Sequence, residues 1–231
     1  MYAKFFKRLL DFILSVTALI VLSPILLVLT VVGAIAMKGN PFFLQPRPGK
    51  KGKDVKEKIF KLIKFRTMSN AKDKDGNLLP DDQRLGKYGV WLRSTSLDEL
   101  PSLVNIVLGH ISIVGPRPQL VRDMTFMTEE QRRRHNVRPG LTGLAQVNGR
   151  NNITWEQKFE YDLQYIDSGI TFVGDVKIIF QTVGKVLKRS DTVREGTVSD
   201  VDFGDWLMME GKVDQETYEK KQEEARDLLG V

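Results

Sequence analysis

Hydrophobic positions are spread unevenly along this chain, and the longest apolar run lies near the N-terminus. No charged residue occurs from Phe12 to Met37. At about 1.5 Å per helical residue, this run would reach about 39 Å, enough to cross a bilayer core of about 30 Å. Ser23 and Pro24 sit near its midpoint. Because proline lacks a backbone donor and clashes with the preceding turn, we expect the helix to break there, which leaves two halves too short to span alone.

Basic residues lie on both sides of the apolar run, and such residues favour the cytoplasmic side of a membrane. A helix that enters, bends at Ser23-Pro24 and leaves on the same side keeps both groups in the cytoplasm. The Ser23 hydroxyl would help to satisfy backbone groups that the proline leaves free. A kinked helix that spans the membrane and a buried core helix remain as alternatives. The basic residues are Lys4, Lys7 and Arg8 before the run, and Lys38, Arg47, Lys50, Lys51 and Lys53 after it.

The rest of the chain predicts a mixture of helices and short strands. Residues 58–68 alternate as a strand does, whereas 41–49 read as an irregular exit from the first helix and 69–82 as a polar loop. We expect an α+β fold: a re-entrant membrane helix-break-helix, then a mostly helical cytoplasmic domain with short strands and interfacial amphipathic helices. Helices are predicted at 97–108, 119–134, 154–167, 173–189 and 214–229, with an extended piece at 111–114.

Three domains follow from these patterns: a membrane hairpin at 1–37, a catalytic domain at 38–190 and an acidic tail with a helix at 191–231. The predicted helix at 173–189 mixes apolar and basic residues, which suits a lipid interface. Packing of that helix on a soluble core fits the same pattern equally well.

Composition narrows the function. The chain has no cysteine, which excludes disulfides and thiolate metal sites, and its two histidines make a histidine-based zinc site improbable. Residues 191–231 carry 12 acidic and 5 basic side chains, so the remainder carries about +13 although the net charge is +6. A basic body of this kind binds nucleic acid, anionic lipid or phosphorylated small molecules. No nucleic-acid-binding motif is present, so no nucleic-acid partner is expected.

Asp98 and Glu99 are the strongest candidates for chemistry. Two adjacent carboxylates at the start of a helix can bind Mg2+, which prefers oxygen ligands, and a carboxylate can attack phosphorus. The structural alternative is a capping box formed by Ser96 and Glu99. Pro101 disturbs that alternative, because it would lie beyond the first turn. The helix would then begin nearer Pro101 and leave both carboxylates at the junction.

Several cations could hold phosphate groups. Arg117 lies between two prolines, which restrict its backbone and present its guanidinium at little entropic cost. Lys64 and Arg66 would share one face of the predicted strand. The glycine-rich stretch from 140 to Arg150 could bring backbone amides near a ligand. The run 132–134 of three arginines and nearby Arg138 read as a solvated or lipid-facing surface, and the pair Trp155 and Phe159 as packing.

Six ordered motifs resemble those of the monotopic polyprenol-phosphate phosphoglycosyl transferases, the bacterial sugar transferase family. The resemblance covers residues 1–190. It is closest to the small catalytic-core type, as in the bacillosamine-type transferase of bacterial protein N-glycosylation. The motifs are Ser23-Pro24, the strand residues 64–68, the run from Arg93 to Pro101, 114–118 with Arg117, 137–143, and 146–150 with Arg150.

The resemblance implies a two-step reaction. Asp98 would attack the β-phosphorus of a UDP-sugar and release UMP, and undecaprenol phosphate, a polyprenol phosphate, would then accept the phosphosugar. Glu99 would hold Mg2+ beside Asp98. Arg93 and Arg117 would bind phosphate, and Lys64, Arg66 and Arg150 would contact substrate.

The same resemblance implies a monotopic protein on the cytoplasmic face of the bacterial inner membrane. A homodimer and downstream glycosyltransferases are the expected protein partners. Two other classes fit the same residues. A membrane-tethered Mg-dependent phosphodiesterase or phosphatase would use the same carboxylates without needing the lipid acceptor. A non-enzymatic scaffold would use the basic face to bind anionic lipid.

Overall fold

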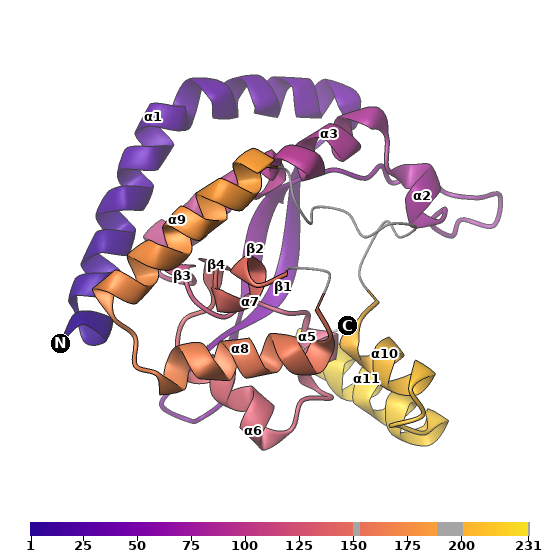
Figure 1. The fold of residues 1–231 in the computed structure, drawn as a ribbon. Coiled ribbons are helices and arrows are strands. Elements are labelled where there is room, and N and C mark those ends of the chain that lie inside the picture. Colours follow the sequence, from indigo (N-terminus) through magenta and orange to yellow (C-terminus); the bar gives the residue numbers. More distant parts are fainter. Residues whose placement is uncertain (150–152, 189–200, 231) are drawn as a thin grey trace.

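A computed structural model describes residues 1–149, 153–188 and 201–230. The long apolar run forms helix α1 (Phe6–Ala36), which follows a short 3-10 turn, η1 (Tyr2–Lys4). Figure 1 shows that α1 bends in its middle, so that its two arms frame one side of the molecule. The hydrogen-bonded helix continues through Pro24, so the predicted break is a bend within one helix.

Ser23 has the backbone role predicted for it. Its hydroxyl donates a hydrogen bond to the carbonyl of Ile20 at 2.8 Å. In a regular helix that carbonyl accepts from the N–H four residues later, which is the group that Pro24 lacks. The serine therefore replaces the hydrogen bond that the proline removes, and the helix continues.

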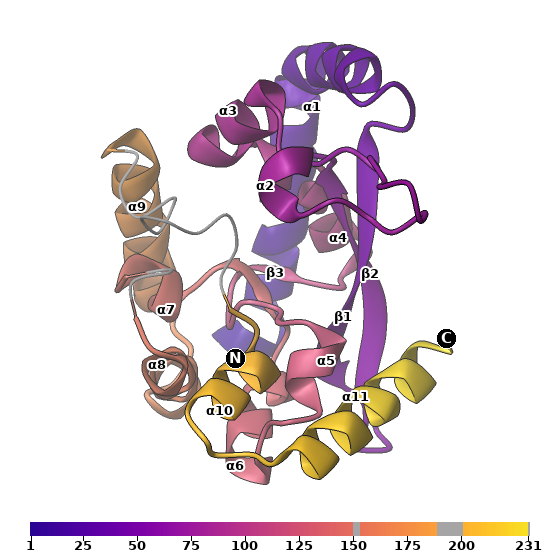
Figure 2. The ribbon, with the colours of Figure 1, turned by 90° about the vertical axis from the view of Figure 1, so that its right-hand side faces the viewer.

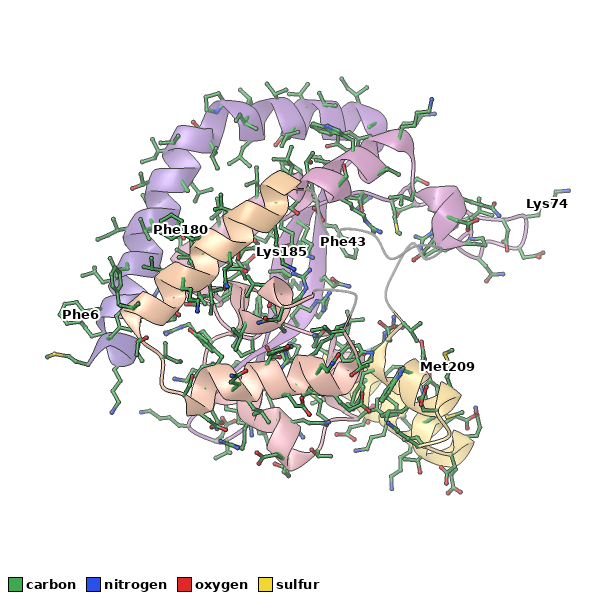
Figure 3. All side chains as sticks on the ribbon, in the orientation of Figure 1. Phe6, Phe43, Lys74, Phe180, Lys185 and Met209 are labelled. Atoms are coloured by element: carbon green, nitrogen blue, oxygen red, sulfur yellow. The ribbon has the colours of Figure 1, made fainter. Side chains whose placement is uncertain are left out.

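The outer surface of α1 is apolar and exposed. Figure 3 shows side chains projecting outward along its convex side, and Ile20, Val21, Leu27 and Ile35 are each more than 60% exposed. Only 11% of the most apolar 18-residue stretch of α1 is buried, so α1 is not a core helix. An exposed apolar surface of this extent marks a membrane or protein contact. Together with its length, this supports membrane association.

The first arm of α1 is attached to the body by buried polar contacts. Asp11 accepts hydrogen bonds from the Ser112 hydroxyl and from the backbone N–H of Ile113, the latter at 3.1 Å. Arg8 donates to the carbonyls of Ile106 and Val107 at 2.5 and 2.7 Å. These charged groups are thus satisfied inside the fold rather than solvated.

The body contains a β-hairpin of two long strands. β1 (Phe42–Lys51) pairs antiparallel with β2 (Glu57–Phe65), which confirms the strand predicted at 58–68. The irregular exit predicted at 41–49 is wrong, because this segment is β1. Its prolines are tolerated for two reasons. The sheet has two strands, so β1 has one open edge, and Pro46 and Pro48 are two residues apart, so their backbone nitrogens point to the same edge. Their missing N–H groups therefore lie at the open edge, where no ladder bond is needed.

The predicted helix at 97–108 has two parts, a 3-10 turn η2 (Leu97–Ser102) and helix α4 (Leu103–Leu108). Asn105 of α4 is buried and joins this segment to β2. Its side-chain oxygen accepts from the N–H of Ile63, and its amide donates to the carbonyl of Lys61, both at 2.9 Å. The core here consists of Phe60, Leu62, Leu103, Ile106 and Ile111, with Ala18, Leu19 and Leu22 of α1 against it.

The prediction of one helix at 119–134 is wrong. The segment contains α5 (Val121–Met124), α6 (Glu129–Arg132) and the 3-10 turn η3 (Arg133–Asn136). Thr128 starts a separate helix, because its hydroxyl accepts from the N–H of Gln131 in a capping box. A second, parallel strand pair is formed by β3 (Ser112–Val114) and β4 (Gly140–Thr142). The remaining short helices are α2 (Asp81–Arg84), α3 (Lys87–Thr95) and α7 (Leu144–Val147).

The C-terminal helices agree with the prediction, with one addition. The helices α8 (Trp155–Asp167), α9 (Phe172–Lys188) and α11 (Gln215–Leu229) occur where they were expected. The additional helix is α10 (Phe203–Met209), which lies with α11 beside α5, as Figure 2 shows. Trp155 and Phe159 pack together as predicted, and Phe203 and Trp206 of the tail complete their aromatic cluster.

We predict that Asn105→Leu lowers the thermal unfolding midpoint by about 5–10 °C. The change leaves a β2 N–H and a β2 carbonyl without their buried partner, at a cost of about 1–3 kcal/mol each. Thermal denaturation in detergent measures the effect. Asn136→Leu, the same change at an exposed position, is the control and should leave the midpoint unchanged. Equal midpoints for both variants would show that Asn105 does not hold α4 on β2.

Candidate active site

Asp98 and Glu99 lie on the 3-10 turn η2 between α3 and α4. Ser96 enters the turn with a left-handed backbone (φ 55°), a conformation that few residues other than glycine adopt. Its side chain makes no capping hydrogen bond, so the capping-box interpretation is wrong. The α-helix starts only after Pro101, which leaves both carboxylates at the junction, as the proline suggested.

Glu99 is the point at which three segments meet. Its Oε1 accepts from Nζ of Lys64 at 3.1 Å and from the guanidinium of Arg117 at 2.6 Å. Lys64 comes from β2 and Arg117 from the loop after β3. The side chains of Lys64 and Glu99 are largely buried, whereas that of Arg117 is 41% exposed. Three predicted site residues, far apart in the sequence, are thus in direct contact.

The two carboxylates differ in their ionisation. Burial raises the pKa of Asp98 to about 6, helped by the negative charge of Glu99 and opposed by Lys64, Arg117 and Arg93. Burial also acts on Glu99, but the charges of Arg117 and Lys64 and their hydrogen bonds outweigh it and hold the pKa of Glu99 well below its usual range. Glu99 is therefore a fixed anion, while Asp98 titrates close to neutral pH.

Beside Glu99 is a narrow pocket of about 20 Å3, which is room for one water molecule. Of the described residues that line it, three are cations, Arg47, Lys64 and Arg117, and only Glu99 is an anion. Burial lowers the pKa of Lys64, because its charge is removed from water. A buried excess of positive charge of this kind is stabilised by an anion.

Arg47 is a residue of the pocket that the sequence analysis counted only among the basic flanks of the apolar run. Its guanidinium donates to the carbonyl of Pro118 at 2.9 Å, and its buried Nε has no hydrogen-bond partner. Burial, followed by the charge of Arg117, lowers the pKa of Arg47 to about 10. The sequence did contain a signal that Arg47 belongs to the site, because Arg47 lies between Pro46 and Pro48, as Arg117 lies between two prolines.

The other predicted cations differ in position. Nε of Arg93 donates to the Thr67 hydroxyl at 3.1 Å, and its charge helps to lower the pKa of Asp98. Arg66 instead donates to the carbonyl of Phe42 at 3.4 Å, and none of its hydrogen bonds within the described chain reaches either carboxylate. Arg150 lies outside the described residues.

Glycines place the loop of Arg117. The N–H of Gly115 donates to the Thr142 carbonyl and that of Gly140 to the Pro116 carbonyl, both at 2.8 Å. A Cβ on Gly140 would lie 2.1 Å from the nitrogen of Gly115, so only glycine allows this approach. Gly140 belongs to the stretch predicted to bring backbone amides near a ligand, but its N–H instead holds the two loops together.

Arg134 also holds the loop that carries Arg117. Its guanidinium donates to the carbonyl of Arg117 and forms an ion pair with Asp162, both at 2.6 Å, and its side chain is 1% exposed. The solvated or lipid-facing surface predicted for 132–134 is therefore wrong for Arg134. Three consecutive arginines in a sequence do not reveal that one of them, Arg134, has a buried carboxylate partner, Asp162, on α8.

The donors available for Mg2+ are carboxylate oxygens. Asp98 and Glu99 are adjacent, and only Oε1 of Glu99 is used by the two cations. Groups of three or more metal-ligating side chains do not occur in the part of the chain that the structure describes. Mg2+ is commonly bound by one or two carboxylates together with substrate phosphates and water. The donor set therefore fits Mg2+ shared with a phosphate substrate and does not form a complete protein cage.

A family model described as bacterial sugar transferase matches residues 2–189. The match covers helix α1, the carboxylate turn and all the loops around the pocket. It ends before α10 and α11, so the tail lies outside it.

Curated proteins with related sequences carry similar names. An uncharacterized sugar transferase EpsL of Bacillus subtilis (strain 168) is 48% identical over 181 residues, covering 78% of this chain and 87% of the relative. The UDP-glucose:undecaprenyl-phosphate glucose-1-phosphate transferase of Klebsiella pneumoniae is 43% identical over 188 residues, and that of Escherichia coli (strain K12) is 36% identical over 190 residues. These matches cover 78% and 79% of this chain but only 40% of each of those two longer proteins.

We predict that Glu99→Gln lowers the pKa of Asp98 below its value of about 6. Removing the adjacent negative charge favours ionised Asp98, and Lys64 and Arg117 then act on Asp98 alone. Carbon-13 NMR titration of the carboxyl groups measures the change, with Asp98→Asn to assign the signal. Glu130→Gln, at an exposed carboxylate, is the control. An unchanged pKa in Glu99→Gln would contradict the coupling of the two groups.

Proposed function

This chain belongs to the bacterial sugar transferase family and is a phosphoglycosyl transferase, and we propose that it transfers a phosphosugar from a UDP-sugar to polyprenol phosphate. Undecaprenol phosphate is the acceptor named in the relatives from Klebsiella and Escherichia. The products are UMP and a polyprenol-diphosphate sugar. The reaction is the first membrane step in building a glycoconjugate.

One observation carries the proposal: a titratable carboxylate, Asp98, is adjacent in the chain to an ionised one, Glu99, which lines a pocket with more cations than anions. Asp98 has a pKa of about 6, so near neutral pH it is mainly a carboxylate able to act as a nucleophile. Arg47, Lys64 and Arg117 provide positive charge where a diphosphate would lie. Phosphoryl transfer depends mainly on positioning and charge neutralisation, and this pocket supplies both.

In the first step, an oxygen of Asp98 attacks the β-phosphorus of the UDP-sugar. An O–P bond forms, and the bond from that phosphorus to the bridging oxygen breaks. The electron pair leaves with UMP, and Asp98 then carries the phosphosugar as an acyl phosphate. The positive charges of Arg93 and Arg117 stabilise the negative charge that develops on the phosphate oxygens.

In the second step, an oxygen of the polyprenol phosphate attacks the same phosphorus. The bond to Asp98 breaks, and the carboxylate is restored. Arg117 and Lys64 keep Glu99 ionised through their contacts at 2.6 and 3.1 Å, so the turn that carries Asp98 keeps its position. Division of the transfer into two steps lets the soluble and the lipid substrate use one set of cations in turn.

Mg2+ would be held by Asp98 and Glu99, and when bound it would neutralise charge on the diphosphate. The metal would add its positive charge to that of Arg117, which contacts Glu99 at 2.6 Å. The pocket has room for only one water, so the sugar nucleotide would bind largely at its mouth and place its diphosphate inward.

The bend of α1 supports a monotopic placement on the cytoplasmic face of the bacterial inner membrane. The exposed apolar arms would enter one leaflet, with Pro24 near the deepest point. The basic residues on both flanks would remain in the cytoplasm. Such a placement puts the carboxylate turn at the interface, where a lipid phosphate and a soluble nucleotide can both arrive.

We predict that Asp98→Asn reduces UMP release by at least about a thousandfold while the fold is retained, because the amide is a poor nucleophile. UMP release is measured with a UDP-sugar in the presence and absence of undecaprenol phosphate. Asp227→Asn, on the exposed surface of α11, is the matched control and should keep full activity.

The wild type should in addition show one equivalent of UMP without the acceptor, and mass spectrometry should detect a phosphosugar on Asp98. Turnover should require the lipid. Repeated UMP release without the lipid would instead indicate a hydrolase. The absence of any adduct under single-turnover conditions would remove Asp98 as the nucleophile.

We also predict that both ends of α1 face the cytoplasm. Ala3→Cys and Gly39→Cys each introduce a single thiol, because the chain has no cysteine. In intact cells, a membrane-impermeant maleimide should label neither variant, and permeabilisation should allow both to react. Labelling of only one variant in intact cells would identify a spanning helix and contradict the re-entrant placement.

A further inference from the structure

A second pocket lies at the turn end of the β1–β2 hairpin, away from the carboxylates. It measures about 690 Å3 and is lined by the hairpin residues 49–53 and 58–60, by Gly109 and His110, and by Arg138. We call it the hairpin pocket. Lys58 and Lys64 both belong to β2 and are six residues apart, which at about 3.3 Å per residue separates them by about 20 Å. The hairpin pocket is therefore a different site from the pocket at Glu99.

The hairpin pocket is lined by five cations and no carboxylate among the described residues: Lys50, Lys51, Lys53, Lys58 and Arg138. None of the five forms an ion pair with a described residue. The closest acidic residue of β2, Glu57, is already bound by Arg132 and His135. Asp54 lies by Gly52 in the turn, near the side chain of Lys58, and does not line the pocket. One carboxylate near five cations leaves the pocket with an excess of positive charge.

The ring of His110 is held in a single hydrogen-bonding state. The contacts of Asn105 with the N–H of Ile63 and the carbonyl of Lys61 fix which side of its amide carries the NH2 group. That NH2 lies 3.3 Å from Nδ1 of His110, so Nδ1 accepts the hydrogen bond. The ring proton is therefore on Nε2, and His110 offers a donor to the pocket. Phe60 stacks on the ring with centroids 5.4 Å apart and keeps it in place.

Arg138 is positioned in a similar way. Its Nε donates to the carbonyl of Gly109 at 3.0 Å. Its terminal nitrogens have no hydrogen-bond partner in the described part of the chain, so they remain available to a ligand. A planar guanidinium anchored through Nε presents the donor pair that binds two oxygens of a phosphate.

From these contacts we propose that the hairpin pocket binds a phosphate-bearing anion. An oriented imidazole N–H, an anchored guanidinium and four lysines form a donor set for phosphate or diphosphate oxygens. The same chemistry is offered by a soluble pyrophosphate group and by the headgroup of an anionic phospholipid. The site does not depend on the transfer reaction, because none of its residues has a role there.

The two histidines of the chain make the site observable by NMR. His110 lines the pocket, whereas His135 is buried against Glu57 and acts as an internal reference. The full chain, with labelled histidine, is placed in nanodiscs of phosphatidylcholine. In one arm, inorganic pyrophosphate is added, and in the other, phosphatidylglycerol replaces part of the lipid. We expect the His110 signal to shift and saturate in at least one arm, which identifies the source, while the His135 signal stays unchanged.

Variants test whether the shift arises from this pocket. Lys53→Gln with Lys58→Gln changes two exposed lysines and should weaken the response about tenfold or more, since each lysine contributes about a factor of five near a phosphate surface. Lys72→Gln with Lys74→Gln removes the same charge from the polar loop and should leave the response unchanged (Figure 3 labels Lys74). No saturable shift of His110 in either arm, or equal weakening by both double variants, would overturn the proposal.

Discussion

The carboxylate of Glu99, shared by Lys64 and Arg117, is the contact on which the site depends. It joins the β2 strand, the η2 turn and the loop after β3 at one point. Glu99 is the shared partner of both cations, so loss of its charge would leave Lys64 and Arg117 without a carboxylate partner. The same carboxylate influences the chemistry of Asp98: burial raises the pKa of Asp98 to about 6, and the fixed negative charge of Glu99 adds to that shift.

The segments that meet at Glu99 are held in place by further contacts with neighbouring residues. Asn105 binds the backbone of β2 and so fixes α4, which continues the turn of the carboxylates. Arg134 holds the carbonyl of Arg117 and is itself paired with Asp162 of α8. A site that transfers phosphoryl groups gains from such support, because its cations need no rearrangement as charge develops.

Much of the fold follows from local patterns. The bent helix, β2, the helices at 154–167, 173–189 and 214–229 and the carboxylate turn were all predicted from periodicity and from proline. Several misses have the same physical cause, contacts between distant segments, whereas the division of 119–134 follows from a local capping box at Thr128. The prolines of β1 are compatible with a strand only because one edge is open, and the burial of Arg134 depends on Asp162, 28 residues later. Arg47 had a visible signal, its two flanking prolines, but only the fold shows that it faces Pro118.

The polar contacts of α1 affect how the chain can be assembled during synthesis. Asp11 is buried against Ser112 and Ile113, and Arg8 against the carbonyls of Ile106 and Val107, so their partners lie about a hundred residues later in the chain. Synthesis proceeds from the N-terminus, so α1 is made about a hundred residues before those partners exist. The anchor of the enzyme is therefore present early, and its catalytic body closes onto that anchor only after residue 113 has emerged.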